Sequence, residues 1–152
     1  MASLSTHVLV VDDYEQWRVF LVSFLTEMEL QVVTHASDGL EAVQKAGEFQ
    51  PAVIVLDIGL PKLNGIEAAR QIRAVSPRSK ILFLSENRSA DIVQEAMRIG
   101  AVGFVVKSDA AHDLGAAIKT ILGGEQFLST SLAKHAVETL AHNVSQKSWG
   151  KL

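Results

Sequence analysis

Four short apolar runs constrain the fold of this chain more than any other feature of its sequence. They cover residues 8–11 (VLVV), 52–56 (AVIVL), 81–84 (ILFL) and 104–106 (FVV), and each ends at a polar side chain. Because these runs do not alternate with polar residues, we expect strands buried on both faces, as in a parallel sheet covered by helices. Residues 31–35 form a weaker strand candidate.

Helical periodicity occupies the segments between these runs. Apolar residues recur at three- and four-residue steps, which predicts amphipathic helices. The segments concerned are residues 17–28, 39–47, 65–75, 90–99 and 114–122. Strand and helix thus alternate five times up to about Gly123. This alternation indicates a doubly wound α/β fold, in which helices cover both faces of an open parallel sheet.

The sequence after Gly123 breaks this alternation. Apolar residues between Leu132 and Leu140 predict one more amphipathic helix, whereas residues 145–152 are polar and have no period. We therefore expect one domain over residues 1–123, followed by a linker or tail helix within residues 124–152.

Composition narrows the classes of function. Hydrophobic residues make up 48% of the 152 residues, enough for the core of one domain. The formal net charge of −3 argues against a surface that holds a nucleic-acid backbone. The absence of cysteine excludes disulfides, thiolate catalysis and cysteine-based metal centres. No apolar run approaches the roughly 20 residues of a membrane helix, and residues 1–6 do not resemble a signal segment, so we expect a cytoplasmic protein without membrane contact.

Five polar side chains at the ends of the predicted strands identify a candidate site. Asp12 and Asp13 follow the first strand, Asp57 the third, Ser85 the fourth and Lys107 the fifth. Ligands of a doubly wound sheet bind beyond the carboxyl ends of its strands, so these side chains are expected to meet at one edge. Each has an ordinary alternative, since aspartate and serine often cap helices or form turns, and lysine is usually solvated. Their joint placement favours a functional site.

The residue types of this site indicate its chemistry. Three neighbouring carboxylates repel one another, and a cation between them relieves the repulsion. Oxygen ligands without His or Cys point to magnesium rather than zinc. A magnesium ion beside a lysine suits a phosphoryl group, whose oxygens the two cations neutralise. Asp57 is the better nucleophile candidate because it stands alone on a central strand, whereas the adjacent Asp12 and Asp13 suit metal binding.

Four motifs, in this order and spacing, resemble the receiver domain of two-component response regulators. They are residues 8–13 (VLVVDD), residues 53–65 (VIVLDIGLPKLNG), Ser85 and residues 104–107 (FVVK). The resemblance covers about residues 7–123. It implies a flavodoxin-like fold with a five-stranded parallel sheet in the order 2-1-3-4-5 and five flanking helices. It also implies a phosphorylatable signalling switch rather than an enzyme, active only in its own phosphorylation and dephosphorylation.

The resemblance also implies roles for the acidic residues. Asp57 would accept a phosphoryl group from the phosphohistidine of a sensor histidine kinase. Asp13, Asp57 and the backbone carbonyl of Gly59 would ligate Mg²⁺ directly, and Asp12 would act largely through water.

The implied switch involves the phosphoryl contacts and the fifth strand. Lys107 would pair with the phosphoryl oxygens, and Ser85 would shift to hydrogen-bond one of them. In the family an aromatic side chain on the fifth strand then turns inward; here that residue is Phe104, whose alternative role is plain core packing. The surface expected to change spans residues 90–122. Ser108 replaces the proline common after the lysine, so we expect a trans peptide or a strained loop there.

The residues from Gly123 to Leu132 resemble the subgroup of regulators whose output is a LuxR-type helix-turn-helix. The predicted output is therefore transcription regulation. No such DNA-binding module lies within residues 124–152, so we expect an isolated receiver or a regulator that binds other proteins, without direct nucleic-acid binding by this segment. A homodimer could form through the last two strand–helix units or through the tail helix, and the sequence does not decide between these interfaces.

Two other classes of function compete with the switch. A hydrolase of the haloacid-dehalogenase type also combines aspartate, magnesium, Ser or Thr and lysine. Its nucleophile lies in a DxD motif on the first strand beneath a cap insertion, whereas this chain has adjacent Asp12 and Asp13 and no such insertion. A receiver-like scaffold that binds a partner without phosphorylation is disfavoured by the complete set of site residues.

Overall fold

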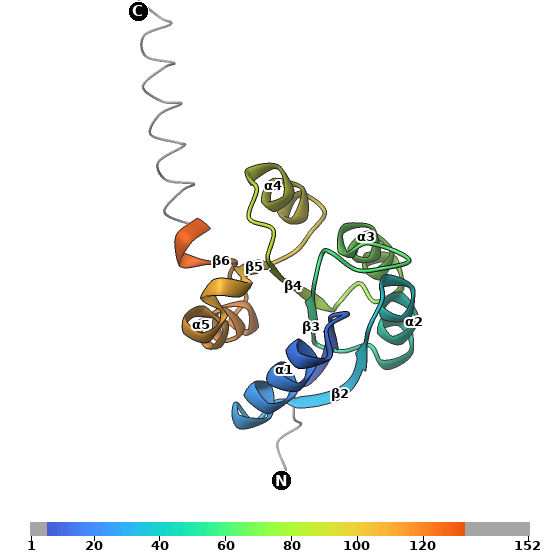
Figure 1. The fold of residues 1–152 in the computed structure, drawn as a ribbon. Helices are drawn as coiled ribbons and strands as arrows, with labels where there is room; N and C mark the ends of the chain where they lie inside the picture. The colour runs from blue at the N-terminus through green and yellow to red at the C-terminus, as the bar shows by residue number, and fades with distance from the viewer. Residues whose placement is uncertain (1–5, 133–152) are drawn as a thin grey trace, which may run out of the picture.

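A single parallel sheet forms the centre of the molecule (Figure 1). The structure is a computed structural model that describes residues 6–132. Within those residues the sheet has six strands in the order β2-β1-β3-β4-β5-β6, and every neighbouring pair is parallel. The strands are β1 His7–Val11, β2 Gln31–Ala36, β3 Val53–Leu56, β4 Lys80–Ser85, β5 Gly103–Val106 and β6 Phe127–Leu128.

Five α-helices of the described chain cover the two faces of this sheet (Figure 1). One hydrophobic core joins the sheet to α1 and α5, and the other joins it to α2, α3 and α4. The helices are α1 Glu15–Glu27, α2 Gly39–Phe49, α3 Gly65–Val75, α4 Ala90–Arg98 and α5 Ala110–Leu122. The predicted doubly wound fold and the strand order 2-1-3-4-5 are therefore confirmed.

The strands show why the apolar runs do not alternate with polar residues. In β1, Leu9 and Val11 face the core beneath α2, α3 and α4, whereas Val8 and Val10 face the core beneath α1 and α5. All four side chains are fully buried. A strand that is covered on both faces needs apolar residues at every position, and this requirement produces the continuous runs.

Side-chain caps fix where the three helices on one face begin. Asp38 accepts a hydrogen bond from the Glu41 amide at α2, and Asn64 accepts one from the Glu67 amide at α3. Ser89 does the same at α4. These caps satisfy amides that have no partner within the helix. The starts of α2 and α3 thus fix the loops that follow the carboxyl ends of β2 and β3.

The sixth strand was not predicted from the sequence. After α5 the chain returns as β6, which pairs with β5. Ser129, which is fully buried, donates its amide to the Phe104 carbonyl at 2.8 Å and its hydroxyl to Asp109 Oδ2 at 2.7 Å. Asp113 Oδ2 accepts the Thr130 amide at 2.8 Å. The sheet thus extends beyond the Gly123 break.

The predicted tail helix lies almost entirely outside the described residues. The chain is helical over residues 130–132, and Leu132 packs into the core beside α4. The remainder of the segment falls in residues 133–152. No helix within residues 6–132 is long and apolar enough to cross a membrane.

Candidate functional site

Three carboxylates meet at the carboxyl edge of the sheet. Asp12 and Asp13 follow β1, and Asp57 follows the adjacent strand β3. One oxygen of each carboxylate lies within 4.8 Å of an oxygen of the other two. Asp12 and Asp57 are buried, whereas Asp13 is exposed. The acidic cluster therefore opens to solvent on the Asp13 side.

Lys107 brings a positive charge into this cluster. It follows β5 and begins a short 3-10 helix, Lys107–Asp109. Its Nζ lies 2.7 Å from Asp12 Oδ2 and donates a hydrogen bond to Asp57 Oδ2 at 3.3 Å. The side chain is only 4% exposed. This lysine is thus a buried counter-ion of two carboxylates rather than a solvated surface residue.

Ser85 lines the same pocket, at the end of β4 between the strands that precede Asp57 and Lys107. The sequence predicted that Ser85 follows the fourth strand, whereas in the structure it is the last residue of β4. Its buried Oγ accepts a hydrogen bond from the Asn87 amide at 3.1 Å. The pocket has a volume of about 230 Å³. Its lining includes five of the predicted site residues, Asp13, Asp57, Gly59, Ser85 and Lys107. It also includes four residues that sequence reasoning missed, Tyr14, Ile58, Glu86 and Asn87, each within two positions of a predicted one.

The backbone around Asp57 holds its carboxylate in place. The Asp57 amide donates to the Val11 carbonyl at 3.1 Å, and the Ile58 amide donates to Asp57 Oδ1 at 2.8 Å. Gly65, the first residue of α3, packs so closely that a Cβ there would overlap the Asp57 carbonyl oxygen. At Gly59 a Cβ would meet no atom within 4 Å, so this part of the pocket is open.

Burial and charge shift the pKa values of the two central groups. Burial raises the pKa of Asp57, and the nearby Asp12 carboxylate adds to this, while Lys107 opposes it only in part. Burial lowers the pKa of Lys107, but the Asp12 carboxylate beside it and the charge of Asp57 outweigh this, so its pKa is raised. The lysine therefore stays charged, and the carboxylate of Asp57 is destabilised in its ionised form.

The donor set fits a hard divalent cation. Asp12 Oδ2 is buried and lies 2.7 Å from Lys107 Nζ, so this single ammonium balances only part of the negative charge of the three carboxylates. Together with the oxygens of Asp13 and Asp57, the Asp12 carboxylate provides the ligand type that Mg²⁺ prefers.

Phe104, the predicted switch residue, lies in the core. Its side chain is fully buried, and its ring centroid lies 6.0 Å from that of Phe83. Phe104 therefore packs in the core, and the change of its side-chain orientation on phosphorylation stays a prediction. No peptide bond among residues 6–132 is cis, so the bond between Lys107 and Ser108 is trans.

Comparison with known proteins identifies the family. Residues 8–119 match the response regulator receiver domain. The chain belongs to this family. Receiver domains are signalling domains rather than enzymes, and they carry an acidic pocket of the kind formed here by Asp12, Asp13 and Asp57.

Relatives of this receiver domain include both transcription regulators and a chemotaxis protein. It is 33% identical over 137 residues to the transcriptional regulatory protein LiaR of Bacillus subtilis, covering 90% of this chain and 65% of LiaR. It is 33% identical over 127 residues to the transcriptional activator ExaE of Pseudomonas putida, covering 83% and 59%. The chain therefore spans about three fifths of the length of these regulators. Chemotaxis protein CheY of Thermotoga maritima is 36% identical over 104 residues, covering 68% and 87%.

Solved structures show the same fold. A LuxR-family response regulator from Aurantimonas sp. SI85-9A1 matches with a TM-score of 0.86 at 29% identity, covering 91% of this chain and 99% of that one. The response regulator domain of Thermotoga maritima CheB matches with a TM-score of 0.70 at 36% identity, covering 76% and 95%. The predicted resemblance to receivers of LuxR-type regulators is confirmed.

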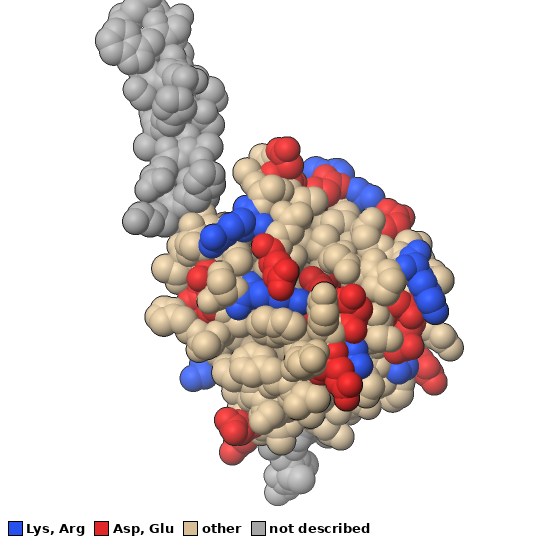
Figure 2. Space-filling view, in the orientation of Figure 1, with Lys and Arg blue, Asp and Glu red and all other residues tan. Residues whose placement is uncertain are grey.

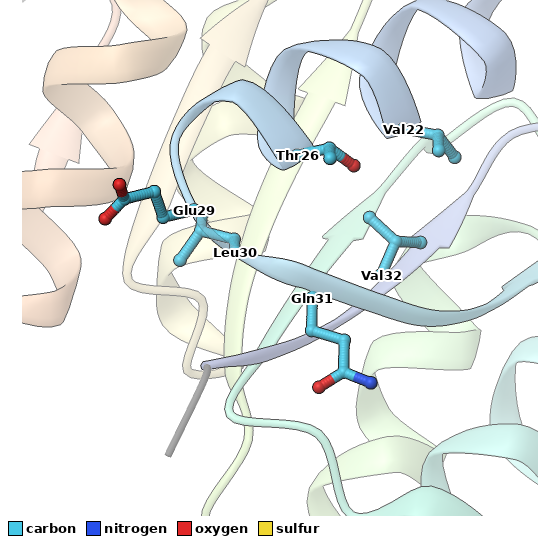
Figure 3. Close-up of a pocket in the computed structure, with 6 residues that line it drawn as sticks. All are labelled: Val22, Thr26, Glu29, Leu30, Gln31 and Val32. Atoms are coloured by element: carbon cyan, nitrogen blue, oxygen red, sulfur yellow. The ribbon is translucent and has the colours of Figure 1, made fainter. Parts of the chain in front are cut away.

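A second hollow of this receiver domain lies away from the acidic cluster. It has a volume of about 430 Å³ and lies between the end of α1 and β2 (Figure 3). Its lining is Val22, Thr26, Glu29, Leu30, Gln31 and Val32, which offers a single carboxylate and no basic group. On the face that Figure 2 shows, acidic side chains gather, and the Lys and Arg side chains are scattered rather than joined in a continuous basic patch.

Proposed function

We propose that this receiver domain is a Mg²⁺-dependent phosphoacceptor switch, in which Asp57 takes a phosphoryl group from the phosphohistidine of a sensor histidine kinase. The observation that carries the proposal is the position of Asp57. Its carboxylate lies beside the oxygens of Asp12 and Asp13 and 3.3 Å from the ammonium of Lys107, in an open pocket. This is an arrangement of one nucleophile, two metal-binding carboxylates and one cation.

The transfer follows from these positions. An oxygen of Asp57 attacks phosphorus, the bond between phosphorus and the imidazole nitrogen breaks, and the electron pair stays on that nitrogen. Lys107 neutralises charge on the phosphoryl oxygens, and Ser85 moves to hydrogen-bond one of them. Asp12, Asp13, Asp57 and the Gly59 carbonyl hold Mg²⁺, which supplies the remaining positive charge when it is bound.

The proposed output is transcription regulation, as in the relatives named as transcriptional regulators. We propose that residues 1–123 form the main part of the receiver unit, that β6 extends its sheet, and that the chain beyond leads from it as a linker. The switch acts through its conformation, and its own chemistry is limited to accepting and losing the phosphoryl group. A scaffold that binds partners without phosphorylation is the alternative that the following experiment decides.

The test is phosphorylation by a small-molecule phosphodonor such as acetyl phosphate, followed by intact mass spectrometry. The wild type should gain one phosphoryl group in the presence of Mg²⁺ and none with a chelator. Asp57→Asn should gain none. Asp91→Asn, which removes an exposed carboxylate of α4 outside the pocket, should behave as the wild type.

Two results would count against the proposal. Labelling that persists in Asp57→Asn would overturn the choice of Asp57 as nucleophile. A wild type that takes up no phosphoryl group at any Mg²⁺ concentration would favour the scaffold.

A further inference from the structure

The ammonium of Lys107 is held from two directions. On one side lie Asp12 Oδ2 at 2.7 Å and Asp57 Oδ2 at 3.3 Å. On the other side lies the indole ring of Trp17, with Nζ 4.9 Å from its centroid. A cation over the face of an aromatic ring at this distance is attracted by the negative charge of that face. Trp17 therefore contributes to the position of the lysine, although it does not itself line the acidic pocket.

Trp17 and Lys107 both line a further hollow, separate from the acidic pocket. This hollow, of about 270 Å³, lies between α1 and the start of α5 and is lined by Trp17, Phe20, Lys107 and Ser108 among others. Trp17 packs edge-on against Phe20, with centroids 5.6 Å apart, and also contacts the core beneath α1 and α5. The ring is thus fixed by its neighbours.

We propose that Trp17 is a positioning residue for phosphoryl transfer, because its ring holds the ammonium of Lys107 against the acidic pocket. The inference rests on the proposed function. A lysine side chain has several rotatable bonds, and in open solvent its ammonium samples many positions. With the ring behind it, the ammonium is confined to the side of the pocket where the phosphoryl oxygens develop charge. Positioning of this kind lowers the barrier because the cation is already in place.

Substitutions of Trp17 test the effect on rate. Trp17→Leu keeps an apolar side chain but removes the aromatic face, and should slow Mg²⁺-dependent phosphorylation by a small phosphodonor by about three- to tenfold. Trp17→Phe retains an aromatic face and should recover most of the rate. Val19→Ala provides the control, because this exposed side chain of the same helix lines neither the acidic pocket nor the hollow beside Trp17, and the variant should react at the rate of the wild type.

A double-mutant cycle separates positioning from a general effect on folding. In a Lys107→Met background, Trp17→Leu should cause no further loss of rate, because Trp17 acts through the lysine. A purely structural role of Trp17 would instead slow the reaction by the same factor in both backgrounds.

A spectroscopic signal tests the contact without any reaction. The ring current of Trp17 should shift the NMR signal of the Lys107 ε-methylene upfield, and this shift should vanish in Trp17→Leu. An unshifted signal in the wild type would overturn the inference whether or not the protein is phosphorylated. If the wild type is phosphorylated and Trp17→Leu reacts equally fast, the inference fails while the proposed function stands. If the wild type is never phosphorylated, the proposed function fails, and with it the role of Trp17 in transfer.

Discussion

Asp57 and its neighbours show how a functional residue lowers the stability of its own fold. The carboxylate is buried beside Asp12, and its pKa is raised. A group whose folded pKa exceeds the unfolded value loses stability as the pH rises, and the loss is complete above the folded pKa. Above its folded pKa the ionised Asp57 is therefore a cost to folding, which the proposed phosphoacceptor role would require.

Replacing Asp57 by asparagine should remove this cost. We expect Asp57→Asn to unfold at higher urea than the wild type when Mg²⁺ is absent, by a free energy of the order of 1 kcal/mol at pH 7. Added Mg²⁺ should stabilise the wild type more than the variant, because the variant lacks one ligand. A variant that is less stable than the wild type without Mg²⁺ would contradict this reading of the pocket.

The carboxyl group of Asp113 has a lowered pKa, and its ionised form therefore stabilises the fold. Burial raises the pKa of its carboxyl, but hydrogen bonds from the Thr130 amide, His112, the Thr130 hydroxyl and Ser129 outweigh burial and lower the pKa from 3.8 to about 2. A lowered folded pKa contributes stability that is present above the unfolded pKa and is lost as the pH falls. The carboxylate thus stabilises the return of the chain after α5 at neutral pH.

The pH dependence of unfolding tests this role of Asp113. Between about pH 4 and pH 2 the wild type should lose of the order of 1–2 kcal/mol more than Asp113→Asn, because only the wild type must protonate this carboxylate. Urea unfolding at a series of pH values measures the difference. Equal pH dependence of the two proteins would show that the hydrogen bonds do not favour the ionised form.

Among the elements, α3 has the closest contact with the site. Gly65 begins α3 and donates its amide to the Ile58 carbonyl at 2.7 Å, directly after Asp57. Its lack of a side chain lets the helix approach the Asp57 carbonyl. The helix start therefore sets the position of the β3–α3 loop, which includes Gly59.

A methyl group at Gly65 should disturb both the fold and the site. Gly65→Ala is expected to cost about 1–3 kcal/mol in the free energy of unfolding, since the helix or the strand end must shift. It should also weaken Mg²⁺ binding, measured by titration. Gly115→Ala provides the control, because a Cβ there lies at an ordinary 3.7 Å from Phe24 and alanine favours the helix. Equal stability of the two variants would contradict the account of the close approach.

The elements also show what the sequence could and could not predict. Four of the five strands up to β5 were predictable because burial on both faces leaves continuous apolar runs, whereas the partly exposed β2 has only a weaker signal. β6 was not, because a two-residue strand has no measurable period and is held by polar contacts of Ser129 with residues of other elements. The contact of Trp17 with Lys107 was equally invisible, since it joins two elements far apart in the sequence.

At the scale of the whole molecule, the topology of the sheet explains why the sequence could predict that the site residues lie together. Parallel strands place all their carboxyl ends at one edge, so residues that follow different strands share one pocket. Asp12, Asp13, Asp57 and Lys107 meet there although no two of the three segments are adjacent in the chain. The backbone amide that orients Asp57 and the residues that complete the pocket lining required the structure.

The relation of the receiver to the rest of a regulator is also a property of the whole molecule. This chain spans about three fifths of the length of ExaE and LiaR. The kinase partner, the homodimer and the control of transcription stay predictions for this protein. In the proposed function, the kinase and the control of transcription act through phosphorylation of Asp57, which can be tested directly on the chain.

The most direct measurement is to locate the phosphoryl group itself. The protein is treated with a small phosphodonor and Mg²⁺, reduced with borohydride so that an aspartyl phosphate becomes homoserine, and digested for peptide mass spectrometry. We predict homoserine at position 57 and at no other aspartate. Homoserine at another aspartate, or unmodified Asp57 in a protein that carries a phosphoryl group, would contradict the account.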